Sequence, residues 1–179
     1  MAKLIINNLT KIYGNSPEKA LELMDKGYTN SEIRQETKQV VGVREVSFSV
    51  NEGESFVIMG LSGSGKSTLF RILLGFEQPE KGKVYYDGQD LSKVDIRAVR
   101  RQLGVVLQNG QLMSGNIFSN IVGANPYLTI EDAWEAARMA GLEEDIKDMP
   151  MGMHTMISEG AGTISGGQKQ RLLIARAIV

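Results

Sequence analysis

Cysteine is absent from this 179-residue sequence, which has a single histidine and a single tryptophan. The lack of cysteine excludes disulfides and thiolate metal sites but says little about the compartment. No apolar run approaches the roughly 18 residues of a membrane span, and the N-terminus lacks a signal-peptide core. The net charge of −1 provides no basic field that would attract nucleic acid. These absences favour a soluble, cytoplasmic-type domain without a nucleic-acid partner.

A glycine-rich stretch is the most informative feature that is present. The apolar run 56–59 predicts a strand, and a helical pattern follows at 67–74. Between them, GLSGSGKST at 60–68 fits the phosphate-binding pattern G-x-x-x-x-G-K-[ST], in the strand–loop–helix order that this pattern requires. The sequence therefore predicts a P-loop that binds a nucleoside triphosphate. The alternative is a structural strand–turn–helix without a ligand.

The residue types of this loop suit a triphosphate and its metal ion. Its glycines permit backbone conformations in which N–H groups curl around a phosphate, and the helix adds its positive dipole end. Lys66 supplies a charge for the β- and γ-phosphates, and the Ser67 hydroxyl suits Mg²⁺. The predicted nucleotide-contacting residues of the loop are Gly60, Ser62, Gly63, Ser64, Gly65, Lys66, Ser67 and Thr68.

The rest of the chain indicates an α/β protein with two parts. Strand patterns occur at 3–9, 43–50 and 83–86, and the last is closed by Asp87-Gly88, a hairpin signal. Helical patterns begin at Pro17 and after Thr29, where Glu32 completes a capping box. The run 103–107 predicts a buried parallel strand. We therefore expect a nucleotide-binding core with a β subdomain over 1–108 and a helical subdomain over 109–179.

A second glycine turn, ISGGQ at 164–168, opens the last helix. It has the anion-binding arrangement of a P-loop without the lysine, and alone it is also consistent with an ordinary helix N-cap. Together with the P-loop it resembles the nucleotide-binding domain of ABC transporters, whose signature is LSGGQ. The resemblance covers essentially the whole chain and implies the ABC type of P-loop NTPase fold, with ATP and Mg²⁺ as ligands.

The resemblance also implies how further residues act. In that family two domains pair head to tail, so Ser165, Gly166, Gly167 and Gln168 would contact ATP held by a second copy. Gln108 matches the glutamine that approaches Mg²⁺ and moves with the membrane partner; a polar strand end is the alternative. Tyr13 matches the aromatic that stacks on adenine, although an ordinary strand-end aromatic competes with this interpretation. Transmembrane permease subunits at the inner face of the plasma membrane are the implied partners.

Other features carry weaker interpretations. Glu159 resembles an acidic loop through which exporters touch their partner, or is a solvated loop residue. The methionines at 149, 151, 153 and 156 with His154 fit packing or contact surfaces better than a copper(I) site. Three arginines suggest a solvated helix face: Arg97, Arg100 and Arg101.

The chain departs from the family in two ways, and the first concerns ATP turnover. The chain ends at Val179, directly after the signature helix, so the segments that carry the Walker B carboxylates and the switch histidine are missing from it. We expect almost no ATP turnover by the isolated chain, which leaves a non-catalytic ATP-binding fragment as the alternative function. A DNA-repair type of ABC ATPase is disfavoured because no sustained heptads occur.

The second departure is that the resemblance changes along the chain. Residues 1 to about 70 resemble the glycine betaine/proline importer ATPase, including the helical insertion at 17–40, and the remainder resembles bacteriocin-type peptide exporters. We therefore hypothesise a hybrid of two family members, of natural or engineered origin.

Overall fold

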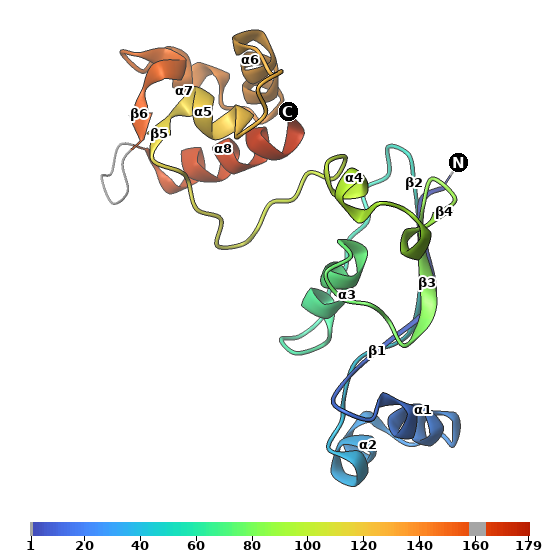
Figure 1. Cartoon of the computed structure of the whole chain (residues 1–179). Helices are drawn as coiled ribbons and strands as arrows, with labels where there is room; N and C mark the ends of the chain where they lie inside the picture. The colour runs from blue at the N-terminus through green and yellow to red at the C-terminus, as the bar shows by residue number, and fades with distance from the viewer. Residues whose placement is uncertain (1, 158–163) are drawn as a thin grey trace. The chain divides into compact units, whose positions relative to one another are not determined.

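The computed structural model describes residues 2–157 and 164–179, which form two compact units. We call residues 1–100 the N-terminal unit and residues 101–179 the C-terminal unit, and describe each by itself. The boundary between the two units follows residue 100, whereas the predicted boundary follows Gln108. Gln108 therefore belongs to the C-terminal unit. Figure 1 shows that strands dominate the first unit and helices the second.

The N-terminal unit contains a four-stranded antiparallel sheet in the order β2-β1-β3-β4. The long strands β1 (Ala2–Tyr13) and β2 (Val40–Asn51) pair along their whole length, and β3 (Lys81–Tyr86) lines the other edge of β1. A tight turn joins β3 to β4 (Gln89–Asp90). Both turn residues have positive φ, 48° at Asp87 and 76° at Gly88, which confirms the predicted hairpin.

The helix that follows the P-loop, α3 (Lys66–Leu73), packs on this sheet. Its apolar residues recur at helical spacing, so they share one face. The core that they complete with the strands consists of Ile6, Leu9, Val43, Leu69, Ile72, Leu73 and Val84. The sheet thus supports the helix at whose N-terminus the phosphate loop lies.

A pair of helices, α1 (Pro17–Asp25) and α2 (Asn30–Thr37), lies at the far end of the β1–β2 ladder (Figure 1). The predicted capping box is present, since the Glu32 amide donates to Thr29 Oγ1 while the Glu32 carboxylate accepts from the Thr29 amide. The pair has a separate small core, formed by Ile12, Ala20, Met24 and Ile33.

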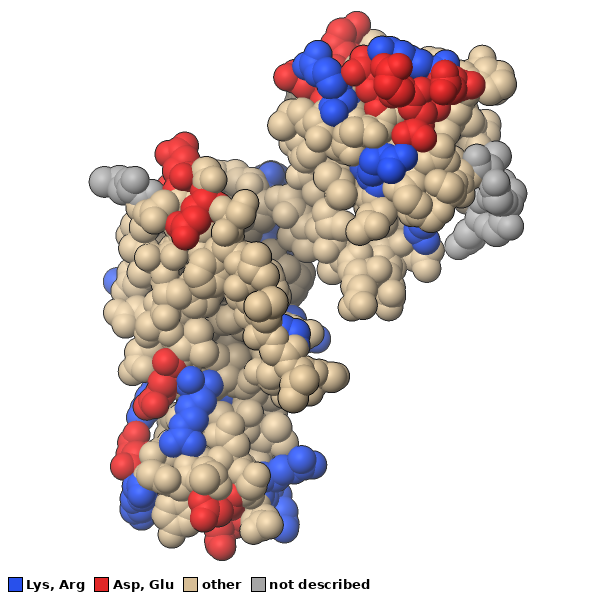
Figure 2. Space-filling view, turned by 180° about the vertical axis from the view of Figure 1, so that it is seen from behind, with Lys and Arg blue, Asp and Glu red and all other residues tan. Residues whose placement is uncertain are grey.

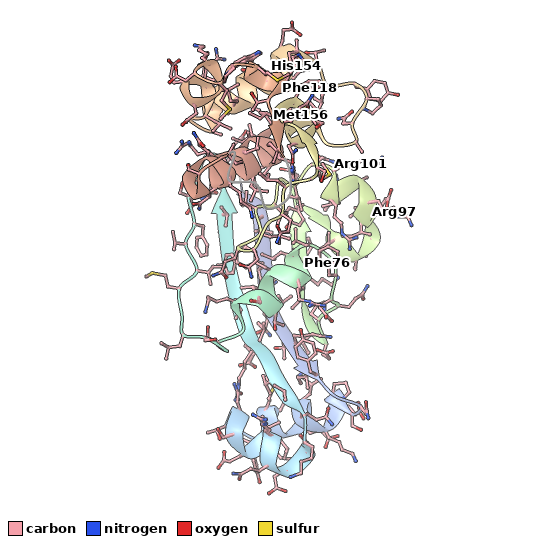
Figure 3. The ribbon with its side chains drawn as sticks, turned by 90° about the vertical axis from the view of Figure 1, so that its left-hand side faces the viewer. Phe76, Arg97, Arg101, Phe118, His154 and Met156 are labelled. Atoms are coloured by element: carbon pink, nitrogen blue, oxygen red, sulfur yellow. The ribbon has the colours of Figure 1, made fainter. Side chains whose placement is uncertain are left out.

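The N-terminal unit ends with the short helices η1 (Leu91–Lys93) and α4 (Ile96–Arg100). The expectation that the three arginines are a solvated face is wrong for Arg100. Its guanidinium donates to the Leu74 and Gly75 carbonyl oxygens at 2.8 and 2.9 Å, and it lies 4.2 Å from the centre of the Phe76 ring. Arg100 therefore caps the C-terminal end of α3, where a cation is favourable. Arg97 points outward from α4 (Figure 3).

The C-terminal unit is a helical subdomain with one two-stranded ladder, β5 (Gly115–Asn116) with β6 (Met156–Ile157). Its other elements are α5 (Ile117–Val122), α6 (Ile130–Met139), α7 (Glu143–Lys147), η2 (Gly152–His154) and α8 (Gly166–Ile178). The central core residues are Ile117, Ile121, Ala133, Ala136, Ala137, Leu142, Ile146, Met153, Leu172 and Ala175. The ladder strands escaped sequence analysis because two residues show no periodicity.

Two strand predictions are wrong. Residues 56–59 and 103–107 have no strand assignment, and most of their side chains are exposed, 74% at Val57 and 67% at Leu107. A strand requires a hydrogen-bonded neighbour, and among residues 2–157 and 164–179 no strand pairs with either segment. Both segments have the apolar composition of a buried strand, but neither pairs with a strand among the described residues.

The surface carries charges of both signs. Figure 2 shows lysines and arginines interspersed with acidic residues on the face in view, in keeping with the net charge of −1. Among the described residues, no helix has both the length and the apolar character needed to cross a membrane.

Candidate nucleotide-binding site

The glycine-rich loop runs directly into α3 and has the backbone conformations that its glycines were predicted to supply. Gly63 and Gly65 have φ of 80° and 91°, in the left-handed region. A side chain at Gly65 would overlap the Gly42 carbonyl oxygen of β2, and a Cβ at Gly60 would come within 2.6 Å of Ser64 Oγ. The loop therefore depends on its glycines both for its curvature and for its close approach to β2.

The Lys66 ammonium lies within the curve of this loop. Its Nζ donates to the carbonyl oxygens of Gly60 and Leu61 at 2.6 and 2.7 Å and to Ser64 Oγ at 3.3 Å. Gly65 is the N-cap residue of α3, and no side chain caps this helix. The first amide groups of α3 thus have no partner within the helix. A cation and several free N–H donors converge at one helix N-terminus, which suits a phosphate group.

The loop borders a cleft of about 570 Å³ in the N-terminal unit. The cleft is lined by the P-loop residues Gly63–Lys66, by β2 and by the exposed segment 56–59. Phe48 and Phe56 stack on its wall, with ring centres 4.5 Å apart and planes 9° from parallel. The donor set fits ATP and Mg²⁺, because the loop offers amides and Lys66 for phosphate oxygens and the exposed Ser67 hydroxyl for the metal ion.

Tyr13 lies beside the first turn of α3. Its hydroxyl is 3.4 Å from Thr68 Oγ1, and its ring contacts β2 where Gly42 has no side chain: a Cβ there would lie 2.9 Å from Tyr13 Cε2. The Lys11 ammonium is 5.5 Å from the ring centre. The structure therefore brings Tyr13 next to the P-loop helix, although a helical insertion separates the two in sequence. Its stacking on adenine stays a prediction.

Gln108 and the signature motif meet in the C-terminal unit. A cleft of about 660 Å³ is lined on one side by residues 106–111 and on the other by Gly166, Lys169, Gln170 and Leu173 of α8. The Gln108 side chain is exposed. Two of the sequence-predicted site elements thus share one surface of this unit.

The signature turn, which we define as Ser165, Gly166 and Gly167, opens α8. The Gln168 amide donates to Ser165 Oγ at 3.2 Å, and Gln168 Oε1 accepts from the Ser165 amide at 2.8 Å, so these residues form a capping box. The turn residues are exposed, whereas Gln168 is partly buried. Gly166 and Gly167 begin the helix, so their amides have no intrahelical acceptor and are available to an anion.

The methionine-rich segment contributes two residues to packing and two to the surface. Met153 is buried in the core and Met149 packs against it, while Met151 and Met156 are exposed. Figure 3 shows His154 and Met156 with Phe118, from the neighbouring elements η2, β6 and α5. No cluster of three or more His, Asp or Glu with metal-binding geometry occurs among the described residues. Glu159 lies outside the described residues.

Sequence reasoning missed three residues that organise the C-terminal unit: Asn120, Asp145 and Arg176. Asn120 is fully buried and bonds to Arg176 of α8, and Asp145 of α7 bonds to two further side chains of α8. The hydrogen bonds from Gln168 and then Arg171 hold the pKa of Asp145 below its ordinary value. Each is a single polar residue within a helical pattern, so no spacing signal identifies it.

Comparison with known proteins places these features in a family. The family described as "ABC transporter" matches residues 43–179. The alpha-hemolysin translocation ATP-binding protein HlyB of Escherichia coli O157:H7 is 41% identical over 155 residues, 87% of this chain and 22% of that protein. The mitochondrial iron-sulfur clusters transporter ABCB7 of Oryzias latipes is 44% identical over 134 residues, 75% of this chain and 18% of that protein.

The structural comparison agrees with the sequence comparisons. A bacterial Atm1-family ABC exporter with ATP bound matches 99% of this chain and 27% of that chain, with a TM-score of 0.74 and 29% identity. The chain spans about a fifth of the length of the curated relatives it matches. With the family match covering most of its length, together with the P-loop and the signature turn, the chain belongs to the ABC transporter family.

Proposed function

We propose that the chain binds Mg-ATP through its P-loop, with Lys66 on the phosphates and Ser67 on the metal ion. The observation that carries this proposal is the convergence in one loop of the Lys66 ammonium, the uncapped N-terminus of α3 and two glycines with left-handed backbone conformation, Gly63 and Gly65. Tyr13, beside the same helix, would stack on adenine.

We further propose that the signature turn completes a nucleotide site in a second copy of the domain, and that Gln108 senses a membrane-embedded partner. The exposed amides of the turn support the first part, and the cleft shared by Gln108 and α8 supports the second. Transmembrane permease subunits, at the inner face of a membrane, are the proposed partners because the chain's relatives are transporters.

We favour export as the direction of transport. The relatives described above are a toxin translocation protein and two other transporters, one of them a solved exporter. A match of 155 residues to a translocation protein extends well into the first 70 residues as well. Three ideas stay hypotheses from the sequence: the importer-like character of that part, the hybrid origin of the chain, and the export of bacteriocin-type peptides.

The direct test is an equilibrium titration of the full chain with Mg-ATP. We expect saturable binding that Lys66→Ala weakens about tenfold or more, because a charge-assisted hydrogen bond contributes roughly 1.5–3 kcal/mol. Lys26→Ala is the matched control, since Lys26 is an exposed lysine at the end of α1, and it should bind as the parent does. Equal affinities for all three proteins, or no binding by the parent, would reject the proposal.

A second candidate function is a module that binds Mg-ATP without hydrolysing it. A phosphate-release assay distinguishes this module from an active ATPase. The P-loop binds phosphates, but a loose phosphoryl-transfer transition state also needs a positioned water and metal. We expect the isolated chain to release almost no phosphate while it binds Mg-ATP. Robust turnover that depends on Lys66 would contradict this expectation.

A further inference from the structure

The Gln168 side chain has protein partners at both ends of its amide. Its Oε1 accepts a hydrogen bond from the Ser165 amide at 2.8 Å, and its Nε2 donates to Asp145 Oδ1 at 2.9 Å. The side chain is partly buried, whereas the three residues of the signature turn are exposed. The amide of Gln168 therefore faces α7 and not the exposed side of the turn.

Asp145 connects this amide to a second residue of α8. Its other oxygen, Oδ2, accepts from Arg171 Nη2 at 2.7 Å, one helical turn beyond Gln168. Residues three apart lie on one face of a helix, so a single carboxylate bridges two neighbouring side chains. The nearby Lys147 of α7 is engaged by Glu143 and Glu144, which leaves Gln168 and Arg171 as the partners of Asp145 across the helix interface.

We propose that Gln168 is a positioning residue that clamps the signature turn to α7 through Asp145. The turn then presents the Gly166 and Gly167 amides, while the glutamine acts from behind them. The proposal deepens the proposed function, on which it rests for the nature of the anion, the ATP of a second copy. It replaces the predicted role of Gln168 as a direct nucleotide ligand by a role in holding the turn.

The first turn of α8 has a physical need for such a clamp. The remainder of the helix is fixed by Leu172 and Ala175 in the core, but its first residues are exposed and its N-terminal amides lack intrahelical acceptors. Helix ends open locally at low free-energy cost. Two charge-assisted hydrogen bonds, which Gln168 and Arg171 donate to Asp145, tie this end to α7 and oppose that opening.

Hydrogen exchange by NMR on the full chain tests the clamp through the Lys169 amide, which donates to Ser165 O at 2.9 Å. Gln168→Glu keeps an acceptor for the Ser165 amide but sets a second carboxylate against Asp145. We expect about tenfold faster exchange at Lys169, from the loss of a charge-assisted hydrogen bond, with unchanged exchange at Ala175. Adding Asp145→Asn should restore protection to within about twofold of the parent, because the new amide at 145 can donate to the new carboxylate at 168.

Glu144→Gln is the matched control, because Glu144 is 85% exposed on the same helix and should leave exchange at Lys169 unchanged. Unchanged exchange in Gln168→Glu, no recovery in the double variant, or an equal loss at Ala175 would each overturn the clamp. Mg-ATP titration of the parent chain is a separate readout, since the P-loop belongs to the N-terminal unit. Failure of the parent to bind Mg-ATP would reject the proposed function, while the exchange result would still decide on the clamp.

Discussion

The buried Asn120 offers the sharpest test of what holds the C-terminal unit together. Its Oδ1 accepts from the Met113 amide at 2.9 Å and from Arg176 Nη2 at 2.6 Å, and its Nδ2 donates to the carbonyl oxygens of Met113 and Asn116. Arg176 also donates to the Asn120 carbonyl oxygen. One side chain thus joins α5, α8 and the segment that follows Gln108.

Asn120→Ala removes four of these hydrogen bonds, although the Asn116 carbonyl oxygen keeps the Ser119 hydroxyl and Arg176 keeps two backbone carbonyl partners. An unsatisfied buried polar group costs roughly 1–3 kcal/mol, and some partners reach water, so we expect a loss of about 3 kcal/mol in the free energy of unfolding. The assay is urea unfolding followed by the fluorescence of Trp134. This residue is the only tryptophan of the chain, and it packs against the core of this unit.

Asn125→Ala is the matched control, because Asn125 is exposed and accepts a single hydrogen bond, from the Tyr127 amide. Its loss should stay within about 0.5 kcal/mol, as for ordinary surface substitutions. If the two variants were equally stable, the hydrogen bonds of Asn120 would contribute nothing measurable, and the reasoning from burial would fail.

Three further predictions concern the N-terminal unit. Gly65→Ala should abolish Mg-ATP binding in a titration, because its Cβ would overlap the Gly42 carbonyl oxygen at a positive φ; normal binding would contradict this. Tyr13→Leu should weaken ATP binding about tenfold, with inorganic triphosphate binding as the unaffected control, since base stacking contributes roughly 1–3 kcal/mol. A hydrogen bond from Ser92, and to a lesser extent one from Lys83, lowers the pKa of Asp90 to about 2. The associated stability is present above about pH 4 and is lost as pH falls toward 2; carboxyl NMR should show this low midpoint, and a midpoint near 4 would refute it.

Sequence patterns predicted the local structure best where one short signal decides it. The Thr29 capping box, the Asp87-Gly88 turn and the P-loop glycines all appear as expected, because caps and tight turns depend on a few neighbouring residues. The resemblance to the ABC transporter family was also confirmed. Two glycine motifs in one chain are more specific than either alone.

Predictions that depended on distant partners failed. The apolar composition of 56–59 and 103–107 indicates strands, but a strand forms only with a neighbour. The arginine pattern of 97–101 gave no sign that Arg100 would reach the end of α3. The roles of Asp145 and Asn120 were equally invisible, because a contact across 23 or 56 residues leaves no periodic trace.

The pairing of Tyr13 with Val40 gives the helical insertion a simple structural property. These residues are cross-strand neighbours at the tip of the β1–β2 ladder, so the inserted segment leaves the sheet and returns to it at one point. Its core is separate from the one beneath α3 and includes Ile12 of β1. A short hairpin turn in place of the insertion would close the same residue pair, so removal of the inserted segment would leave the strand register unchanged. The length of the chain between β1 and β2 is therefore independent of the nucleotide loop that β2 leads into.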